Sequence, residues 1–373
     1  MKRLLPTILC ALAGAAIFAQ TPHFHPPHRA INFPDVPGYR TLKCDFHQHT
    51  VFSDGSVWPT IRVEEALRDS LDAISLTEHL EYQPHRDDIP HPDRNRAYEL
   101  ARGYAEAYDL LVVNGSEITR DLPPGHCNAI FLQDANRLLV DDSVEVFREA
   151  RRQGAFVFWN HPNWTAQAPD GIARLTDLHR QLLDEGLLQG IEVINDLTYS
   201  EEALQIALDH DLTIMATSDI HGLVDWQYEV PQGGHRPVTL VFAEARTPEA
   251  IKEALLAGRT VGWFNNLLVG RDEHLVPLLE SSLQVVDAAY QPDSQVLNVR
   301  LRNRSDAEYH IEYLGDYTLH ARSEFFTIPP QSTTTLQLKT LEPRTAVELP
   351  LRVLNAVTAP GEQARVRLEV EVE

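Results

Sequence analysis

Cysteine and positive charge are both scarce in this chain of 373 residues. Its three cysteines, Cys10, Cys44 and Cys127, are too few and too unevenly placed for a disulfide framework or a thiolate zinc site. Lysine and arginine total 32 against 54 aspartate and glutamate residues, which gives a formal net charge of −22. A surface this acidic repels phosphate polymers at long range, so the composition argues against duplex nucleic acid as a partner.

Membrane-spanning runs and glycine-rich phosphate loops are missing as well. No stretch reaches the roughly 20 apolar residues that cross a bilayer, so we expect no stable membrane insertion. Without a glycine-rich phosphate loop, ATP-driven group transfer is not favoured. The first 19 residues hold Lys2 and Arg3, a mostly apolar run to Phe18, and Ala19, a pattern typical of a signal peptide. We therefore expect cleavage near Ala19 and an exported protein, periplasmic or secreted.

The hydropathy pattern divides the remaining chain into an arm and two domains. Residues 20–40 are rich in proline and histidine and predict an extended N-terminal arm. Between residues 41 and 270, short apolar segments alternate with helical patterns, as in parallel strands joined by crossover helices. Strands are predicted at 42–47, 73–77, 111–114, 129–132, 155–159, 191–194 and 212–217. Residues 281–373 alternate apolar and polar side chains with period two, which predicts a small antiparallel all-β sandwich.

Histidines and carboxylates stand at the carboxyl ends of these predicted strands. His47 and His49 are separated by Gln48, so a strand would direct both imidazoles to one face, where they could reach one cation. Asp54 follows in a Ser53-Asp54-Gly55 turn, close enough to serve the same ion or a neighbouring one. Alone, this pattern is weak evidence, because surface strands also carry histidines.

The same pattern recurs at four other predicted strand ends. The residues concerned are His79, Glu117, His126, His161, Asp219 and His221. For each of them taken singly, a hydrogen-bonded polar strand end is as good an explanation as metal ligation. Jointly they are hard to explain by packing, because buried polar groups without partners are costly. Since α/β barrel enzymes keep their active sites on this face, the pattern predicts a multinuclear metal site.

With these motifs in order, the sequence resembles the PHP (polymerase and histidinol phosphatase) superfamily over residues 42–262. The motifs are His47-Gln48-His49, Ser53-Asp54-Gly55, Thr77-Glu78-His79, Gly115-Ser116-Glu117, His126, Asn160-His161-Pro162 and Ser218-Asp219-Ile220-His221. The resemblance implies a distorted (β/α)7 TIM-like barrel that binds two or three divalent ions and hydrolyses phosphate esters. With its β-rich tail, here expected to be an Ig-like sandwich, the chain also resembles the exported PHP phosphodiesterases of bacteria.

The resemblance further implies how the ions would be held. One ion would take His47, His49, Glu117 and Asp219, and a second would be bridged by Glu117 with His126 and His161. A third would take Asp54, His79 and His221, although Asp54 replaces the histidine of some trinuclear members, which leaves the occupancy of that site open. Imidazole and carboxylate donors without thiolate suit Zn, Mn or Fe(II).

The function expected from these ligands is hydrolysis of small phosphate esters by attack of a metal-bridging hydroxide on phosphorus. A phosphodiesterase is the leading interpretation. Two alternatives stay open: a phosphomonoesterase of the same fold, and a non-catalytic surface-binding or carbohydrate-binding protein that uses its β-sandwich. The complete ligand set argues against the second alternative.

A cationic loop follows the second predicted strand. It contains His85, Arg86, His91 and Arg94, and we expect it to overhang the mouth of the barrel. One or more of these side chains would then bind the non-bridging phosphate oxygens or protonate the leaving group. The alternative is a proline-rich surface loop whose charges are solvated.

Overall fold

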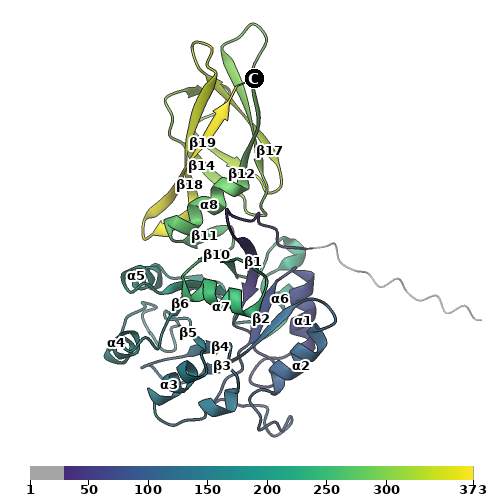
Figure 1. Ribbon diagram of the computed structural model, residues 1–373, viewed down its shortest axis with the longest axis vertical. Coiled ribbons are helices and arrows are strands. Elements are labelled where there is room, and N and C mark those ends of the chain that lie inside the picture. Colours follow the sequence, from purple (N-terminus) through teal and green to yellow (C-terminus); the bar gives the residue numbers. More distant parts are fainter. Residues whose placement is uncertain (1–28, 373) are drawn as a thin grey trace, which may run out of the picture.

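The computed structural model describes residues 29–372, so the predicted signal peptide and residues 20–28 of the predicted arm lie outside the described residues. Figure 1 shows an elongated molecule with a helix-covered barrel at one end and an all-β domain at the other. Over the described part of the chain, no helix is both long and apolar enough to cross a membrane.

Parallel strands form the wall of the barrel, in the order β1-β2-β3 and then, beyond β4, β5-β6-β8. These strands are β1 (Arg40–Asp45), β2 (Ala73–Leu76), β3 (Leu111–Ile118), β5 (Phe156–Trp159), β6 (Gly190–Asn195) and β8 (Thr213–Thr217). The predicted (β/α)-type barrel is therefore confirmed. Its parallel strands bring their carboxyl ends, and the polar motifs that follow them, to one end of the barrel.

One barrel strand runs against the expected direction. β4 (Cys127–Ile130) is antiparallel to both β3 and β5, whereas the sequence predicted parallel strands in this region. Residues 119–126, which join β3 to β4, contain no helix and are too short for the crossover that a parallel pair requires. Three later strands follow: β9 (Val238–Ala243) is antiparallel to β1 and to β10 (Thr260–Phe264), and β10 is antiparallel to β11 (Leu267–Gly270).

The barrel closes where β1 and β8 end. Gln48 and Ile220 form a parallel bridge, and the His49 N–H donates to the Ile220 carbonyl at 3.0 Å. Arg62, fully buried on α1 (Pro59–Arg68), donates to the carbonyls of His49 and Ile220 at 2.9 and 3.1 Å. One guanidinium therefore fixes the seam at which two histidine-bearing segments leave the barrel.

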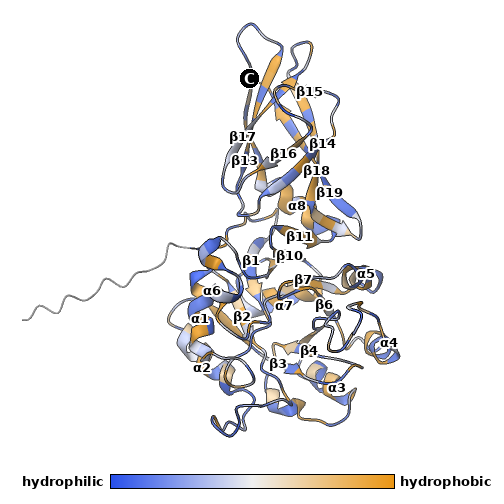
Figure 2. Ribbon diagram, turned by 180° about the vertical axis from the view of Figure 1, so that it is seen from behind, coloured by the Kyte–Doolittle hydropathy of each residue, from blue (hydrophilic) through white to orange (hydrophobic). Residues whose placement is uncertain are grey.

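Helices cover the outside of the barrel, and the longer ones bury apolar side chains on one face. Figure 2 shows both hydrophobic and hydrophilic residues along these helices, as expected for amphipathic elements. In addition to α1 they are α2 (Arg96–Ala105), α3 (Glu145–Arg152), α4 (Asp177–Asp184), α5 (Glu201–Asp209), α6 (Val224–Gln227) and α7 (Pro248–Leu256). Short elements complete this half: η1 (Ala135–Leu138), β7 (Thr198–Tyr199) and η2 (Val230–Gln232).

The C-terminal part is the predicted all-β domain and is preceded by α8 (Asp272–Ser282). One sheet has the order β12-β13-β17-β15, and the other contains β16, β14, β18 and β19. The strands are β12 (Leu283–Tyr290), β13 (Val296–Asn303), β14 (Tyr309–Tyr313), β15 (Thr318–Leu319), β16 (Phe325–Ile328), β17 (Thr333–Lys339), β18 (Ala346–Ala359) and β19 (Glu362–Glu371). The second sheet continues the barrel sheet, because β18 pairs in parallel with β11 through Leu268–Ala356 and Val269–Val357.

Candidate metal centre

His47, His49 and Asp219 form one cluster at the carboxyl ends of the strands. Nε2 of His47, Nε2 of His49 and Oδ1 of Asp219 all lie 3.1 Å from one another. Two imidazole nitrogens and a carboxylate oxygen so arranged repel one another unless a proton or a cation lies between them. The spacing is close to that of neighbouring ligands on an ion with bonds of about 2.0–2.1 Å, so this donor set fits a divalent metal.

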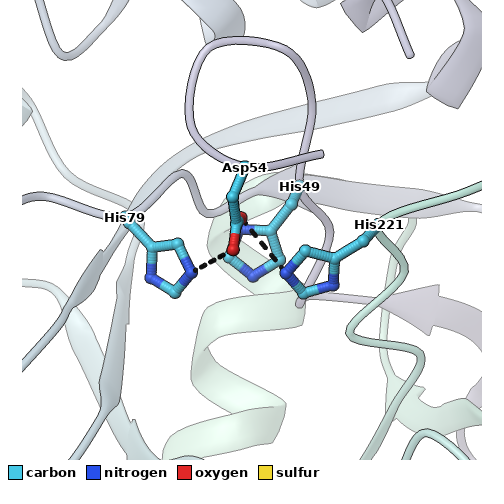
Figure 3. A group of neighbouring side chains, drawn as sticks. All are labelled: His49, Asp54, His79 and His221. Carbon is cyan, nitrogen blue, oxygen red and sulfur yellow. Dashed lines mark ion pairs between the residues drawn. The ribbon is translucent and has the colours of Figure 1, made fainter. Parts of the chain in front are cut away.

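A second cluster surrounds Asp54 (Figure 3). The Asp54 carboxylate lies 3.1 Å from Nε2 of His221, 3.3 Å from Nε2 of His79 and 3.8 Å from Nδ1 of His49. Nδ1 of His221 contacts the Asp219 carbonyl at 2.8 Å, and Nδ1 of His79 contacts the Thr119 hydroxyl at 2.7 Å. Each of these partners leaves Nε2 facing Asp54, which is the orientation that metal-ligating histidines require.

Glu117 lies between the clusters. Its fully buried carboxylate is within ion-pair distance of five histidine rings. The separations are 2.5 Å to His79, 3.0 Å to His126, 3.6 Å to His49, 3.6 Å to His161 and 3.7 Å to His47. A carboxylate with this many imidazole neighbours is placed to bridge ions, as the family resemblance implies.

Histidines supply the charge that balances these carboxylates. Within residues 29–372, no lysine or arginine forms an ion pair with Asp54, Glu117 or Asp219. Burial alone would raise the pKa of all three carboxyl groups. The neighbouring imidazoles outweigh burial and hold each pKa well below its usual range. The carboxylates are therefore ionised and available to cations.

The imidazoles respond in opposite ways to the same environment. Burial lowers the pKa of His47, but Asp219 and Glu192 outweigh it and raise the pKa to about 10. Glu117 and Asp54 likewise raise the pKa of His79 to about 11 against the effect of burial. Burial and the neighbouring imidazoles lower the pKa of His49 to about 3. Because a metal needs neutral imidazoles, its binding here would displace the protons that the carboxylates attract.

Glu192 is a functional candidate that the sequence analysis missed. Its buried carboxylate accepts from Nδ1 of His47 at 2.7 Å, the Thr217 hydroxyl at 2.6 Å, the His161 N–H at 2.7 Å and the Asn195 amide at 2.8 Å. His161 has a φ of 29°, so its backbone needs support. Glu192 therefore orients two predicted ligands, and its signal in the sequence was a single charge inside the apolar run of β6.

The turn that carries Asp54 is held by Glu78 and Gly55. The buried Glu78 carboxylate accepts from the Thr50 N–H at 3.1 Å and from the hydroxyls of Thr50 and Ser53. A Cβ on Gly55 would lie 2.6 Å from the backbone carbon of His49 and from the Thr50 nitrogen. Only glycine fits there, so the Ser53-Asp54-Gly55 turn keeps Asp54 close to its histidines.

A cavity of about 280 Å³ opens onto these clusters. Its lining consists of Asp54, His79, Glu117, His126, His161, Trp164, Asn195, Asp196, Asp219, His221 and Gln227. Sequence reasoning did not single out Trp164, Asn195, Asp196 or Gln227, because no metal-ligand pattern includes them. The structure thus brings together all nine residues for which metal ligation is predicted, and their role as ligands stays a prediction.

The predicted substrate contacts of the cationic loop lie elsewhere. None of His85, Arg86, His91 and Arg94 is among the cavity-lining residues of the described chain. The Arg94 guanidinium donates to the Leu80 carbonyl at 2.9 Å and lies 3.4 Å from the carbonyls of His91 and Pro92. The His91 ring packs 4.6 Å from the Phe52 ring. These interactions engage His91 and Arg94, none of the four side chains lines the cavity of the described chain, and their role as substrate contacts stays a prediction.

Comparison with known proteins agrees with this architecture. Residues 283–369 match the DUF5001 family model, an Ig-like domain. A solved structure from Bacteroides vulgatus, a two-domain protein containing a predicted PHP-like metal-dependent phosphoesterase, is 41% identical, with a TM-score of 0.86. The match covers 93% of this chain and 100% of that one. No curated protein matches.

Two other solved structures show weaker likeness. PsfC from Pseudomonas syringae is 16% identical with a TM-score of 0.43, and the match covers 60% of this chain and 92% of that one. The lesion-specific endonuclease PfuEndoQ from Pyrococcus furiosus is 14% identical with a TM-score of 0.40, covering 66% of this chain and 62% of that one.

The near full-length match to the Bacteroides protein defines the class of this chain. It belongs to the family of two-domain proteins that join a PHP-like metal-dependent phosphoesterase to an Ig-like domain. The predicted family, the predicted fold class and the prediction of a metal-dependent phosphoric ester hydrolase are confirmed.

Proposed function

We propose that this chain is an exported phosphodiesterase that hydrolyses small phosphodiesters with two or three divalent ions, Zn, Mn or Fe(II). The charge of the cavity supports a diester rather than a monoester. In the described chain the lining contains four carboxylates, Asp54, Glu117, Asp196 and Asp219, and no lysine or arginine. Bound ions would offset the charge of Asp54, Glu117 and Asp219, which leaves Asp196 as the lining carboxylate that a phosphate would meet. A diester carries one negative charge and a monoester carries up to two, so Asp196 disfavours the monoester more strongly.

Arg120 and Arg94 do not alter this balance. Arg120, which follows β3, has its guanidinium 3.0 Å from Glu81 and also donates to the carbonyls of Val140 and Asp141. Arg94 is tied to backbone carbonyls, as described above. Each group already has acceptors, so turning either toward a phosphate would break existing hydrogen bonds.

In this mechanism the chain's own residues hold the divalent ions in place. When bound, divalent ions would neutralise the phosphate, lower the pKa of a water molecule and stabilise the leaving oxygen. His47, His49, Glu117 and Asp219 would hold one ion, and Glu117 with His126 and His161 would hold a second. Asp54, His79 and His221 would hold a third ion beside the Ser53-Asp54-Gly55 turn. There the Asp54 carboxylate lies between the two imidazoles.

The test compares two substrates that share one leaving group. Methyl 4-nitrophenyl phosphate and 4-nitrophenyl phosphate both release 4-nitrophenolate and differ in whether a second phosphate oxygen is esterified. With protein loaded with Mn²⁺ or Zn²⁺, we expect kcat/KM to be at least about tenfold higher for the diester, equal to about 1.4 kcal/mol in transition-state stabilisation. Release of 4-nitrophenolate is followed by absorbance.

Two variants make the result specific to the site. Glu117→Gln should abolish turnover of both substrates, because it removes the charge that five histidines share. His310→Ala should leave turnover unchanged, since this exposed ring of the C-terminal domain pairs only with Glu308, at 3.0 Å. A higher kcat/KM for the monoester would overturn the proposal in favour of a phosphomonoesterase.

A further inference from the structure

Trp164 is the one apolar side chain in the described lining of the metal-site cavity. The other ten lining residues are histidines, carboxylates or amides. Trp164 nevertheless keeps 45% of its surface exposed. An indole that is half exposed beside a polar site has apolar area that a ligand can still cover.

The backbone holds this indole in place. The Trp164 N–H donates to the His161 carbonyl at 2.8 Å, and the Trp164 carbonyl accepts from the N–H groups of Gln167 and Ala168 at 3.0 and 2.7 Å. The residue is therefore fixed to the segment that carries a predicted ligand, His161. Its exposure results from a defined turn rather than from a free loop end.

The ring lies directly against predicted metal ligands. Its centroid is 5.2 Å from that of His161, with an interplanar angle of 72°, and 5.5 Å from that of His126, with an angle of 55°. Both contacts are tilted or edge-on, and the 45% of the Trp164 surface that stays exposed is what remains for a flat partner. A group esterified to a phosphate at the neighbouring ligands would be one oxygen away from phosphorus and within reach of this surface.

The remaining lining residues restrict the charge of that group. Asn195, Asp196 and Gln227 line the cavity without belonging to the predicted ligand set, and the Gln227 amide donates to Asp196 at 2.5 Å. A second phosphate would meet the Asp196 carboxylate, whereas a neutral ring would not. The exposed indole and the Asp196 carboxylate together favour an uncharged planar substituent.

We propose that Trp164 forms a subsite for a planar aromatic substituent of the substrate, an aryl ring or a nucleobase, which it binds by stacking. This inference rests on the proposed phosphodiesterase function and specifies its substrate class. A stacked ring would bury the exposed indole surface next to His126 and His161, and aromatic pairs gain stability beyond the area they bury.

The experiment measures competition by diester anions that are equal in charge. Diphenyl phosphate and dimethyl phosphate are each tested as competitive inhibitors of the metal-loaded enzyme while it hydrolyses a 4-nitrophenyl ester substrate. The dissociation constant of each inhibitor is also measured independently by calorimetry. We expect diphenyl phosphate to bind at least about tenfold more tightly than dimethyl phosphate. Trp164→Ala should remove most of that difference and leave the dimethyl phosphate constant unchanged, and Trp164→Phe should retain it.

A matched control and a third competitor sharpen the result. Trp226→Ala removes a tryptophan that is 79% exposed and does not line the cavity, so the preference for diphenyl phosphate should persist. Thymidine 5′-methyl phosphate distinguishes the sources of the ring: weakening by Trp164→Ala identifies a nucleobase subsite, and no weakening identifies a subsite for rings esterified directly to phosphorus.

Equal binding of diphenyl and dimethyl phosphate, or equal weakening of both by Trp164→Ala, would overturn the subsite. The outcome is separable from that of the proposed function. A preference for the monoester over the diester would refute the phosphodiesterase, while calorimetry with the two competitors would still report on Trp164.

Discussion

Glu192 shows how much one buried side chain can organise without contacting substrate. It binds His47 through one oxygen and the His161 backbone through the other, so two predicted ligands from different strands share one support. The His47 hydrogen bond occupies Nδ1 and directs Nε2 toward His49 and Asp219. At this scale the metal centre depends on a carboxylate as well as on the ligands themselves.

Glu192→Gln tests that role. The NH2 of the new side-chain amide would point either at Nδ1 of His47 or at the N–H groups of His161 and Asn195. Either way, one hydrogen bond of Glu192 becomes a contact between two donors. We expect metal affinity, measured by calorimetric titration of the metal-free protein, to fall by about 10- to 100-fold. Glu185→Gln is the matched control, because Glu185 lies on the surface and pairs with Arg148. Unchanged affinity in Glu192→Gln would show that His47 is oriented by other contacts.

Helix α4 depends on a neutral histidine. Nε2 of His179 contacts the Pro124 carbonyl at 2.6 Å, and Nδ1 lies 3.2 Å from the Thr176 nitrogen, so the ring donates at Nε2 and accepts at Nδ1. A proton on Nδ1 would face the Thr176 N–H. The ring also packs 4.0 Å from Trp159. Burial lowers the pKa of His179 to about 4.

This arrangement predicts acid sensitivity. Above pH 6.5 the folded and unfolded states are both neutral at this residue. Between pH 6.5 and 4, His179 is protonated in the unfolded state but stays neutral in the folded state. The free energy of unfolding therefore falls as pH falls, by up to about 3 kcal/mol. Urea unfolding of metal-free protein at pH 7.5 and 5.0 measures the loss. His179→Gln should show a smaller loss, and an equal loss would assign the sensitivity to other groups.

At the scale of elements, the sequence predicted what depends on local pattern. The strands of the barrel and their polar ends followed from apolar runs that stop at histidine or carboxylate, as at Trp159 and His161. The alternation of β13 and β19 likewise predicted half-buried strands in the C-terminal domain. These signals are local because side-chain direction repeats within a few residues.

Features set by distant partners escaped prediction. The reversed direction of β4 depends on the short connection from β3 and on pairing with β5. Glu192 can orient His47 only because the fold brings His47, after β1, and Thr217, on β8, beside its carboxylate. The cationic loop was expected at the cavity because it follows β2. The Arg94 guanidinium donates to the Leu80 carbonyl, and the loop's contact with substrate stays a prediction.

At the scale of the molecule, the two domains share a β-sheet and an apolar core. The ladder between β11 and β18 joins their sheets, and one continuous apolar core contains Leu240 and Trp263 of the barrel with Leu349 and Val353 of the β domain. The Asn355 amide also donates to the carbonyl of Asn266 at 2.6 Å. Such continuity favours cooperative unfolding of both domains.

Removing the metals should therefore destabilise the whole chain. Ions that bind only the folded state add about 2.7 kcal/mol when present at 100 times their Kd. We expect scanning calorimetry to give one transition, at a lower Tm after treatment with a chelator, and re-addition of Mn²⁺ or Zn²⁺ to restore it. Two separate transitions, of which only one shifts with chelation, would show that the domains unfold independently.

The ladder between β11 and β18 also limits how the gene can lose or exchange its C-terminal segment. A gene that lost or exchanged the segment beyond residue 282 would leave Leu268 and Val269 on an open sheet edge, which invites aggregation. We therefore expect an exchanged tail to keep the chain soluble only where it supplies a strand that pairs as Ala356 and Val357 do.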